Sequence, residues 1–280
     1  MELGVSGLNA KAAIGPEVTV RLARRAEEIG YRSWWAGEHV VLPSPRTPDS
    51  PMAPTDPILD PLVHLAFVAA ATRSLGLGTA IVILPQRNPV VLAKQVASLD
   101  VLSGGRLSLG VGAGYLAPEM TAVGVPMRER GARTDEYIDA MRSLWLDPAP
   151  AYSGRFAAFA GVDAHPRPTR PVPIVIGGHS PAAFRRAVER GDGWFGNGDE
   201  PADLERHLAG LARAAAGHER RVAGPLHITW MQLRPPSKEQ VIRYRELGVD
   251  RLVVYPLPIE DAGDVERFLE RSAEVFAAAC

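Results

Sequence analysis

Residues 76–112 read GLGTAIVILPQRNPVVLAKQVASLDVLSGGRLSLGVG, and this stretch decides the fold. Gly76–Leu84 is short, apolar and β-branched, which is typical of a buried parallel strand. Asn88–Pro89 supplies an N-cap and a first helical residue, so a helix is expected over Val90–Leu102. Arg106–Gly112 is a second apolar run and predicts another strand. Strand, helix and strand in this order form the βαβ unit of a parallel sheet.

The same alternation continues on both sides of this unit. The expected strands are Leu3–Gly7, Arg32–Ala36, Gly76–Leu84, Arg106–Gly112, Val172–Ile176, Gly193–Phe195, Leu226–Met231 and Arg251–Tyr255. The expected helices begin at Pro16 and end at Gly30, or cover Leu62–Thr72, Val90–Leu102, Ala132–Leu146, Pro181–Arg190, Ala202–Ala216, Lys238–Leu247 and Ala262–Ala278. Eight strands alternating with eight helices predict an α/β fold, a single (β/α)8 TIM-like barrel domain over residues 1–280, rather than an open doubly wound sheet.

Three segments depart from this rhythm. Pro43–Pro61 is rich in proline and too long for a simple connection, which favours a functional lid or a mobile segment. Ala113–Arg130 shows no clear period and is expected to be irregular. Residues 149–172 combine aromatics, glycines and four prolines. We expect an insertion there, with a β-hairpin against the barrel mouth.

Composition argues against several classes of partner. The chain has 31 Lys and Arg residues against 32 Asp and Glu, so no charge excess favours nucleic acid or an acidic membrane. Its one cysteine, Cys280, allows no intrachain disulfide and suits a reducing compartment. The sequence contains neither a signal-peptide pattern nor a run of apolar residues long enough for a membrane span. A cytoplasmic protein acting on a small molecule is expected.

Active sites of such barrels lie at the carboxyl ends of the strands, so the residues that follow each strand are the candidates. Glu38 and His39 follow the second strand and suit proton transfer or hydrogen bonding to a cofactor, although a pair capping the loop explains them equally well. In the third strand, a small residue among β-branched ones at Thr79, Ala80 and Ile81 indicates either a flat ring packed against the backbone or ordinary core packing.

Glycines mark two further strand ends. Gly112 and Ala113 belong to a Gly-Val-Gly-Ala-Gly run in which the backbone can approach a ligand or form a tight turn. Gly177, Gly178, His179 and Ser180 precede a helix that begins with a proline. Free amides at a helix start, next to glycines, form a phosphate site. Ser180 also suits a helix N-cap, and the two roles are compatible.

Taken together, the residues at the strand ends resemble the luciferase-like flavin and deazaflavin oxidoreductase superfamily, and most of all its coenzyme F420-dependent members. The resemblance covers nearly the whole chain and is densest in four motifs. These are Trp34–His39, Leu75–Val90, Leu99–Gly114 and Pro173–Trp194.

The resemblance implies a barrel whose cofactor lies at the carboxyl ends of the strands. It implies that Gly177, Gly178 and Ser180 hold the cofactor phosphate. It places Ala80–Ile81 at a bulge behind the central ring, often through a non-proline cis peptide. It also places Glu38 and His39 near that ring as the acid–histidine pair, with His39 exchanging a proton and Glu38 tuning it.

One position departs from the family's sugar-phosphate dehydrogenases, in which a catalytic glutamate follows the last glycine after the fourth strand. That position is Tyr115 here, and a phenol with a pKa of about 10 is a poor acid at neutral pH. Glu119, four residues later, is a candidate replacement whose direction the sequence leaves open. Glucose-6-phosphate dehydrogenase activity is therefore not expected.

The resemblance favours coenzyme F420, an 8-hydroxy-5-deazaflavin, as cofactor for hydride transfer to or from a small organic substrate. FMN and a monooxygenase reaction form the alternative. Basic residues near the mouth suit the acidic tail of the deazaflavin or are simply solvated surface charges; they are Arg46, Arg87, Arg128, Arg130 and Arg133.

Two readings from other classes stay open. A metal-dependent barrel hydrolase would draw on His39, Glu38, Asp60, His64 or His165, but compact ligand spacing is missing and no metal is expected. A barrel that binds a cofactor without catalysis is the other. A homodimer is expected from the superfamily, without an interface visible in the pattern.

Overall fold

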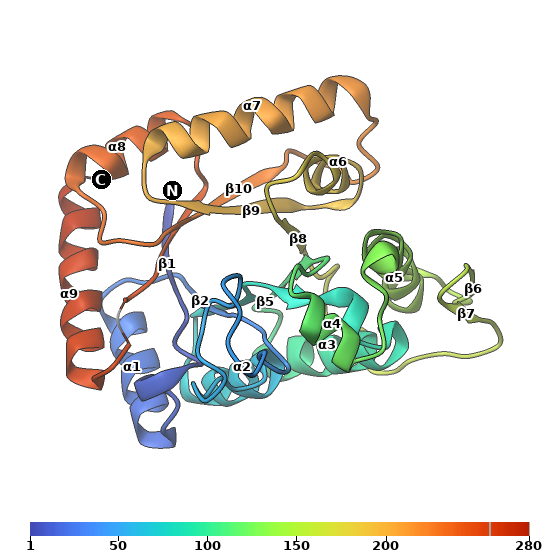
Figure 1. Ribbon diagram of the computed structural model, residues 1–280, viewed down its shortest axis with the longest axis horizontal. Coiled ribbons are helices and arrows are strands. Elements are labelled where there is room, and N and C mark those ends of the chain that lie inside the picture. Colours follow the sequence, from blue (N-terminus) through green and yellow to red (C-terminus); the bar gives the residue numbers. More distant parts are fainter. Residues whose placement is uncertain (258, 280) are drawn as a thin grey trace.

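The computed structural model describes residues 1–257 and 259–279 and shows a closed barrel of parallel strands surrounded by helices (Figure 1). Cys280 lies outside the described residues. The barrel strands are β1 (Glu2–Ser6), β2 (Ser33–Ala36), β3 (Gly76–Thr79), β4 (Val82–Ile83), β5 (Leu107–Gly112), β8 (Ile174–Gly177), β9 (Gly193–Gly198), β10 (His227–Gln232) and β11 (Arg251–Val254). β3 and β4 are two parts of the third barrel strand. Because β1 pairs with β11 and β3 also pairs with β5, the sheet closes on itself. The predicted TIM-like barrel is confirmed.

Helices connect these strands and cover the outside of the barrel. They are α1 (Pro16–Glu28), α2 (Pro61–Ala71), α3 (Pro89–Ser103), α4 (Ala117–Ala122), α5 (Arg130–Leu146), α6 (Pro181–Arg190), α7 (Pro201–Gly217), α8 (Lys238–Glu246) and α9 (Ala262–Ala279), with the short 3-10 turns η1 (Lys11–Ala13), η2 (Leu84–Gln86) and η3 (Met127–Glu129). Most helices begin with a proline at the first turn, where its missing N–H costs nothing. Their sequence-predicted bounds hold to within a few residues.

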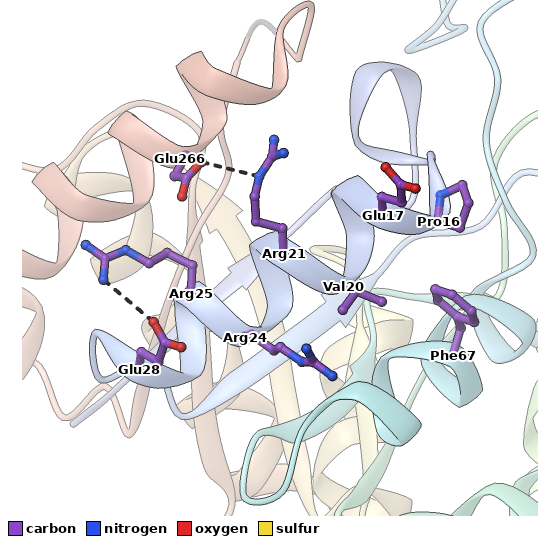
Figure 2. A pocket seen from close by; sticks show the side chains of 9 residues that line it. All are labelled: Pro16, Glu17, Val20, Arg21, Arg24, Arg25, Glu28, Phe67 and Glu266. Atoms are coloured by element: carbon purple, nitrogen blue, oxygen red, sulfur yellow. Dashed lines mark ion pairs between the residues drawn. The ribbon is translucent and has the colours of Figure 1, made fainter.

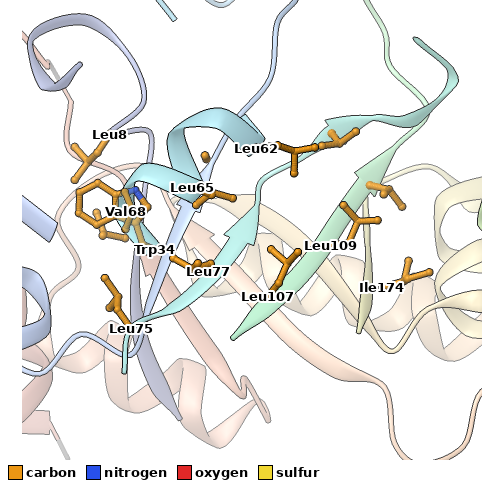
Figure 3. Close-up of a cluster of buried hydrophobic side chains, with 14 of the residues drawn as sticks. Leu8, Trp34, Leu62, Leu65, Val68, Leu75, Leu77, Leu107, Leu109 and Ile174 are labelled. Atoms are coloured by element: carbon orange, nitrogen blue, oxygen red, sulfur yellow. The ribbon is translucent and has the colours of Figure 1, made fainter. Parts of the chain in front are cut away.

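The core follows from the two-residue period of the strands. Side chains pointing outward, such as Leu77, Leu107 and Ile174, are fully buried against the helices (Figure 3). The residues between them point into the barrel, where Trp35, Val175, Phe195 and Val253 form a second, smaller cluster, hereafter the inner cluster. Burial of each such side chain contributes about 1.5–3 kcal/mol to the free energy of unfolding. Packing on the outer and the inner face of the barrel sheet therefore holds the strand ends rigidly in place.

Two elements differ from the sequence prediction. The third strand is interrupted at Ala80–Ile81 instead of continuing over Gly76–Leu84, and the peptide bond there is cis, which confirms the bulge implied by the resemblance. The segment Ala113–Arg130, predicted to be irregular, contains α4 and η3. The six residues of α4 are too few to show a helical period, which is why the pattern was not visible.

The insertion contains the expected hairpin, with β6 (Tyr152–Ser153) antiparallel to β7 (Ala158–Phe159). Its predicted place at the barrel mouth is wrong. The hairpin lies along the outside of α5, where the amide of Phe156 donates to Glu136 and its ring lies between the guanidinium groups of Arg133 and Arg155 (Figure 1).

The chain then returns to the amino end of the barrel, where Thr169 contacts Asp100 on α3 and Arg170 donates to the carbonyl of Leu107. The topological reason is that this insertion joins a helix to the next strand. Such connections begin and end at the amino end of the barrel, opposite the active-site face.

The helices within residues 1–257 and 259–279 include none that is both long enough and apolar enough to span a membrane.

Candidate active site at the carboxyl ends of the strands

The segment after β2 is held in place by the loop after β1. Asn9 is almost fully buried, and its amide nitrogen donates to the carbonyl of Gly37 at 2.8 Å. The amide of Gly37 donates back to the Asn9 side-chain oxygen at 3.2 Å. The same Asn9 nitrogen reaches the carbonyl of Leu59, at the end of the proline-rich loop. One buried side chain therefore fixes where the backbone leaves β2 and so where His39 lies.

His39 is paired with Glu119. The Nδ1 atom of His39 lies 3.0 Å from one carboxylate oxygen of Glu119, and the other oxygen accepts from the amide of Val40 at 2.6 Å. The Glu119 side chain is 1% exposed and that of His39 is 12% exposed. A carboxylate on α4 is thus buried against two consecutive residues after β2. The sequence named Glu119 but left its direction open, and the structure supplies that direction.

Glu38 has a different partner from the one expected. Its carboxylate accepts from Arg87 and, at 2.6 Å, from the amide of Ile83. Arg87 also pairs with Asp60, the N-cap of α2, at 2.6 Å. Burial raises the pKa of Glu38, and the charge of Arg87 opposes this. The expectation that Glu38 tunes His39 is therefore wrong: Glu38 ties β2 to β4 and η2, and Glu119 is the carboxylate on His39.

The bulge between β3 and β4 forms one wall of the strand ends. Thr79 is fully buried and its hydroxyl donates to the carbonyl of Gly110 at 2.6 Å, so it braces β5 instead of facing a ligand. Ala80 packs on the inner cluster and remains partly exposed. A Cβ atom on Gly112 would lie 2.1 Å from the Cδ1 atom of Ile81, so a larger residue there would force the Ile81 side chain to move. Gly112 therefore packs closely against Ile81, whatever its role toward a ligand.

Gly177 and Gly178 lead from β8 into α6. A Cβ atom on Gly177 would meet Ile81 at 2.6 Å, so this glycine also makes room for the bulge. Gly178 has φ of +118°, a conformation that side chains with a Cβ rarely adopt. The hydroxyl oxygen of Ser180 accepts from the amide of Ala183 at 3.2 Å, which confirms the expected N-cap. Pro181 has no N–H and the amide of Ala183 bonds Ser180, so the amide of Ala182 is the one in the first turn of α6 that is left to bind an anionic oxygen.

His179 lies beside this turn, stacked on His207 of α7 with ring centroids 4.2 Å apart. Burial, and then the neighbouring His207, lower the pKa of His179 to about 4. Its Nε2 atom accepts from the amide of Asn197 at 3.2 Å, as a neutral ring can. The turn therefore offers amide dipoles to an anion at neutral pH, and not a histidine cation. Ala113, the remaining candidate, is partly exposed directly after β5.

Tyr115 flanks His39, with the two rings edge to face and their centroids 6.2 Å apart. Its side chain is exposed, and burial of part of it together with the carboxylates of Glu119 and Asp49 raises the pKa of the phenol. The hydroxyl is thus protonated at neutral pH and able to donate a hydrogen bond. The effect of Asp49 also indicates that the proline-rich loop approaches the mouth at Tyr115.

Four of the five arginines near the mouth are engaged within the protein. Arg46 donates to the carbonyl of Ser50, Arg130 to those of Gly114 and Met127, and Arg133 to Glu129. Arg87 holds Glu38, as described above. Arg128 differs, because its side chain is 83% exposed and its contact with Glu129 is 4.0 Å long.

The residues named for a metal centre lie apart. His64 lies on the buried face of α2, where its Nε2 atom accepts from the indole N–H of Trp34 at 3.0 Å. His165 is exposed in the insertion and contacts Asp163. Among residues 1–257 and 259–279, no three His, Cys, Asp or Glu side chains gather as metal ligands.

A groove of about 640 Å³ lies elsewhere, on the outer face of α1 (Figure 2). It is bounded by Phe67 of α2 and Glu266 of α9. Its arginines are engaged: Arg21 pairs with Glu266, Arg24 donates to the carbonyl of Ala71, and Arg25 pairs with Glu28 and Glu270. None of the candidate residues at the strand ends lines this groove, which is a solvated helix surface.

Comparison with known proteins identifies relatives along most of the chain. The luciferase-like monooxygenase family matches residues 1–235. An uncharacterised protein of Mycobacterium tuberculosis is 33% identical over 271 residues, which cover 91% of this chain and 92% of that one. The F420-dependent glucose-6-phosphate dehydrogenase of Amycolatopsis mediterranei is 32% identical over 185 residues, covering 65% of this chain and 53% of the enzyme.

Solved structures share the fold at lower identity. An F420-dependent secondary alcohol dehydrogenase in complex with an F420–acetone adduct superimposes with a TM-score of 0.79 at 17% identity, covering 100% of this chain and 99% of that one. The oxygenating constituent of 3,6-diketocamphane monooxygenase from Pseudomonas putida, in complex with FMN, gives 0.65 at 17% identity, covering 89% and 72%. Both kinds of cofactor therefore occur on this fold.

Proposed function

The chain belongs to the luciferase-like monooxygenase family, and from this premise we propose that it is an oxidoreductase that uses coenzyme F420 to move hydride to or from a small organic substrate. The observation that carries the proposal is the pairing of a partly exposed His39 with a buried carboxylate at the strand ends, on a barrel whose β8 leads through a glycine turn into the capped start of α6. The named relative that shares 32% identity uses F420, which favours the deazaflavin over FMN.

The residues present fit a flat ring with a ribityl phosphate. The turn at Gly178 and the first turn of α6 would hold the phosphate, because amides at a helix start stabilise negative charge. Ala80, partly exposed over the inner cluster, would lie under the ring. Arg128 has the exposure needed to reach an acidic tail. A bound deazaflavin supplies two-electron hydride chemistry, and the protein's part is orientation and proton transfer.

His39 holds or moves the proton in this scheme. Its Nδ1 atom is occupied by Glu119, and the structure records no partner for Nε2 within the described residues. General acid–base catalysis of this kind contributes about 10²–10⁴-fold to a rate. Tyr115, a protonated phenol beside His39, is placed to donate a hydrogen bond to a substrate oxygen.

FMN with a monooxygenase reaction is the second candidate, since a structure of this fold holds FMN and the same turn would hold its phosphate. A side-by-side fluorescence titration of F420 and FMN separates the two. We expect micromolar or tighter binding of F420. Binding of FMN alone would overturn the cofactor assignment.

The phosphate site has its own test, Ser180→Asp. Aspartate caps a helix as well as serine does, so α6 and the unfolding temperature are preserved. The added negative charge repels a phosphate, so the cofactor dissociation constant is expected to rise at least about tenfold. Ser180→Asn is the matched neutral control and retains affinity. Equal affinity of the Asp and Asn variants would place the phosphate elsewhere.

A further inference from the structure

Glu119 reaches His39 from a distant part of the chain. It lies on α4, after β5, whereas His39 and Val40 follow β2. Its carboxylate is 1% exposed and bridges the Nδ1 atom of His39 and the amide of Val40. A buried carboxylate is stabilised only by such donors, so both contacts are needed to hold it. Because it is covered, Glu119 cannot touch a substrate, although it contacts His39, the proposed proton-transfer residue.

We propose that Glu119 is the positioning residue of the active site, which fixes the tautomer and the ring orientation of His39. An ionised carboxylate only accepts hydrogen bonds, so the Nδ1 atom of His39 carries the hydrogen. The neutral ring then has its lone pair on Nε2, the nitrogen for which the described residues supply no partner. The amide of Val40 anchors the second carboxylate oxygen and so prevents Glu119 from rotating away.

The consequence for the reaction rests on the proposed function. With a bound oxidised deazaflavin as the hydride acceptor, Nε2 of His39 would take the O–H proton of an alcohol whose C–H bond supplies the hydride, and the alcohol would become a carbonyl compound. The imidazolium that forms is stabilised by the negative charge of Glu119, as a buried carboxylate does for a catalytic histidine elsewhere. In the reverse direction the imidazolium returns the proton to the carbonyl oxygen.

The residue at position 115 is consistent with proton transfer by His39 and orientation of His39 by Glu119. The resemblance implies a catalytic glutamate at this position in the family's sugar-phosphate dehydrogenases, whereas this chain has a phenol whose raised pKa keeps it protonated at neutral pH. Its carboxylate is four residues later and faces the histidine instead of the mouth. This chain therefore has one proton-transfer group with a buried orienting charge, which suits a substrate that exchanges one proton.

The first test needs no cofactor. In ¹⁵N-histidine-labelled protein at mildly alkaline pH, the signals of His39, assigned with His39→Gln, are expected to show hydrogen on Nδ1 and a bare Nε2. In Glu119→Gln, the side-chain oxygen is expected to keep the shorter contact with Val40, which turns the amide NH₂ toward Nδ1 and moves the hydrogen to Nε2. Asp49→Asn, which removes a nearby charge without a bond to His39, leaves the pattern unchanged.

Hydrogen on Nε2 of His39 in the wild type, or an unchanged pattern in a folded Glu119→Gln variant, would overturn the proposal. The wild-type spectrum decides even if the variant does not fold. The second test uses the cofactor-loaded enzyme. Glu119→Gln is expected to lower kcat by about 100-fold without changing cofactor affinity, and to have no further effect in a His39→Gln background. Additive losses would show that Glu119 acts independently of His39. Absence of F420 binding would overturn the proposed function and leave the tautomer result standing.

Discussion

At the scale of single residues, two histidines of this chain differ in whether they can exchange protons with a ligand, because one is partly exposed and the other is buried. His39 is partly exposed at the strand ends, whereas His64 lies on the buried face of α2 and accepts a hydrogen bond from the indole of Trp34. Burial lowers the pKa of His64 to about 4. The sequence shows a histidine within a helix in one case and after a strand in the other, but exposure decides which of them can exchange protons with a ligand.

The lowered pKa of His64 predicts that the free energy of unfolding decreases in mild acid. Its pKa is about 6.5 in an unfolded chain and about 4 when folded, so the unfolded state binds more protons between these values. Stability is complete above about pH 6.5 and falls toward pH 4. Between about pH 7.5 and pH 5 the loss from this group is about 2 kcal/mol. Urea unfolding at both pH values measures it.

His64→Gln is the control, because glutamine accepts from the indole of Trp34 and does not titrate. The variant is expected to lose about 2 kcal/mol less than the wild type over the same pH interval. Equal losses in both proteins would show that His64 is not the group responsible.

At the scale of elements, helix caps carry information that is visible in the sequence. Asn88 was predicted to begin a helix, and its side-chain oxygen accepts from the amides of Val90 and Val91 at 2.9 and 3.2 Å. The cap works through adjacent residues, so it depends on no tertiary contact. The bounds of α3 were therefore predictable, whereas those of the short α4 were not.

Replacing the cap of α3 tests its contribution. Asn88→Ala leaves two amides without an acceptor and is expected to lower the free energy of unfolding by about 1 kcal/mol. Asn88→Asp retains the acceptor and is expected to retain the stability, as thermal unfolding can measure. Comparable losses in both variants would mean that packing of α3, and not the cap, sets its amino end.

At the scale of the whole molecule, the amino end of the barrel contributes to stability, whereas the carboxyl end contains the candidate active site. Arg106, at the amino end of β5, donates to the hydroxyl of Thr72 and to the carbonyls of Ala69, Leu75 and Ser103. It therefore joins the end of α2 and the start of β3 to the end of α3. Burial lowers the pKa of this guanidinium, which remains charged at neutral pH. In such barrels this end supports stability and the opposite end supports function.

Arg106→Met tests this separation. It keeps most of the apolar stem but leaves several carbonyls without a donor, so the free energy of unfolding is expected to fall by about 2–3 kcal/mol. Cofactor affinity per folded molecule is expected to remain unchanged in a fluorescence titration. A folded variant with weakened cofactor binding would show that the two ends are coupled.

The sequence by itself determined the barrel, most element bounds, the capped turn at Ser180 and the position of His39. These depend on periodicity and on neighbours within a few residues, which a linear pattern records. The tertiary structure decided that Glu119 and not Glu38 faces His39, that Gly112 and Gly177 pack closely against Ile81, and that the insertion lies beside α5. Each is a contact between remote segments whose distance is set only when the sheet closes and its inner and outer faces pack.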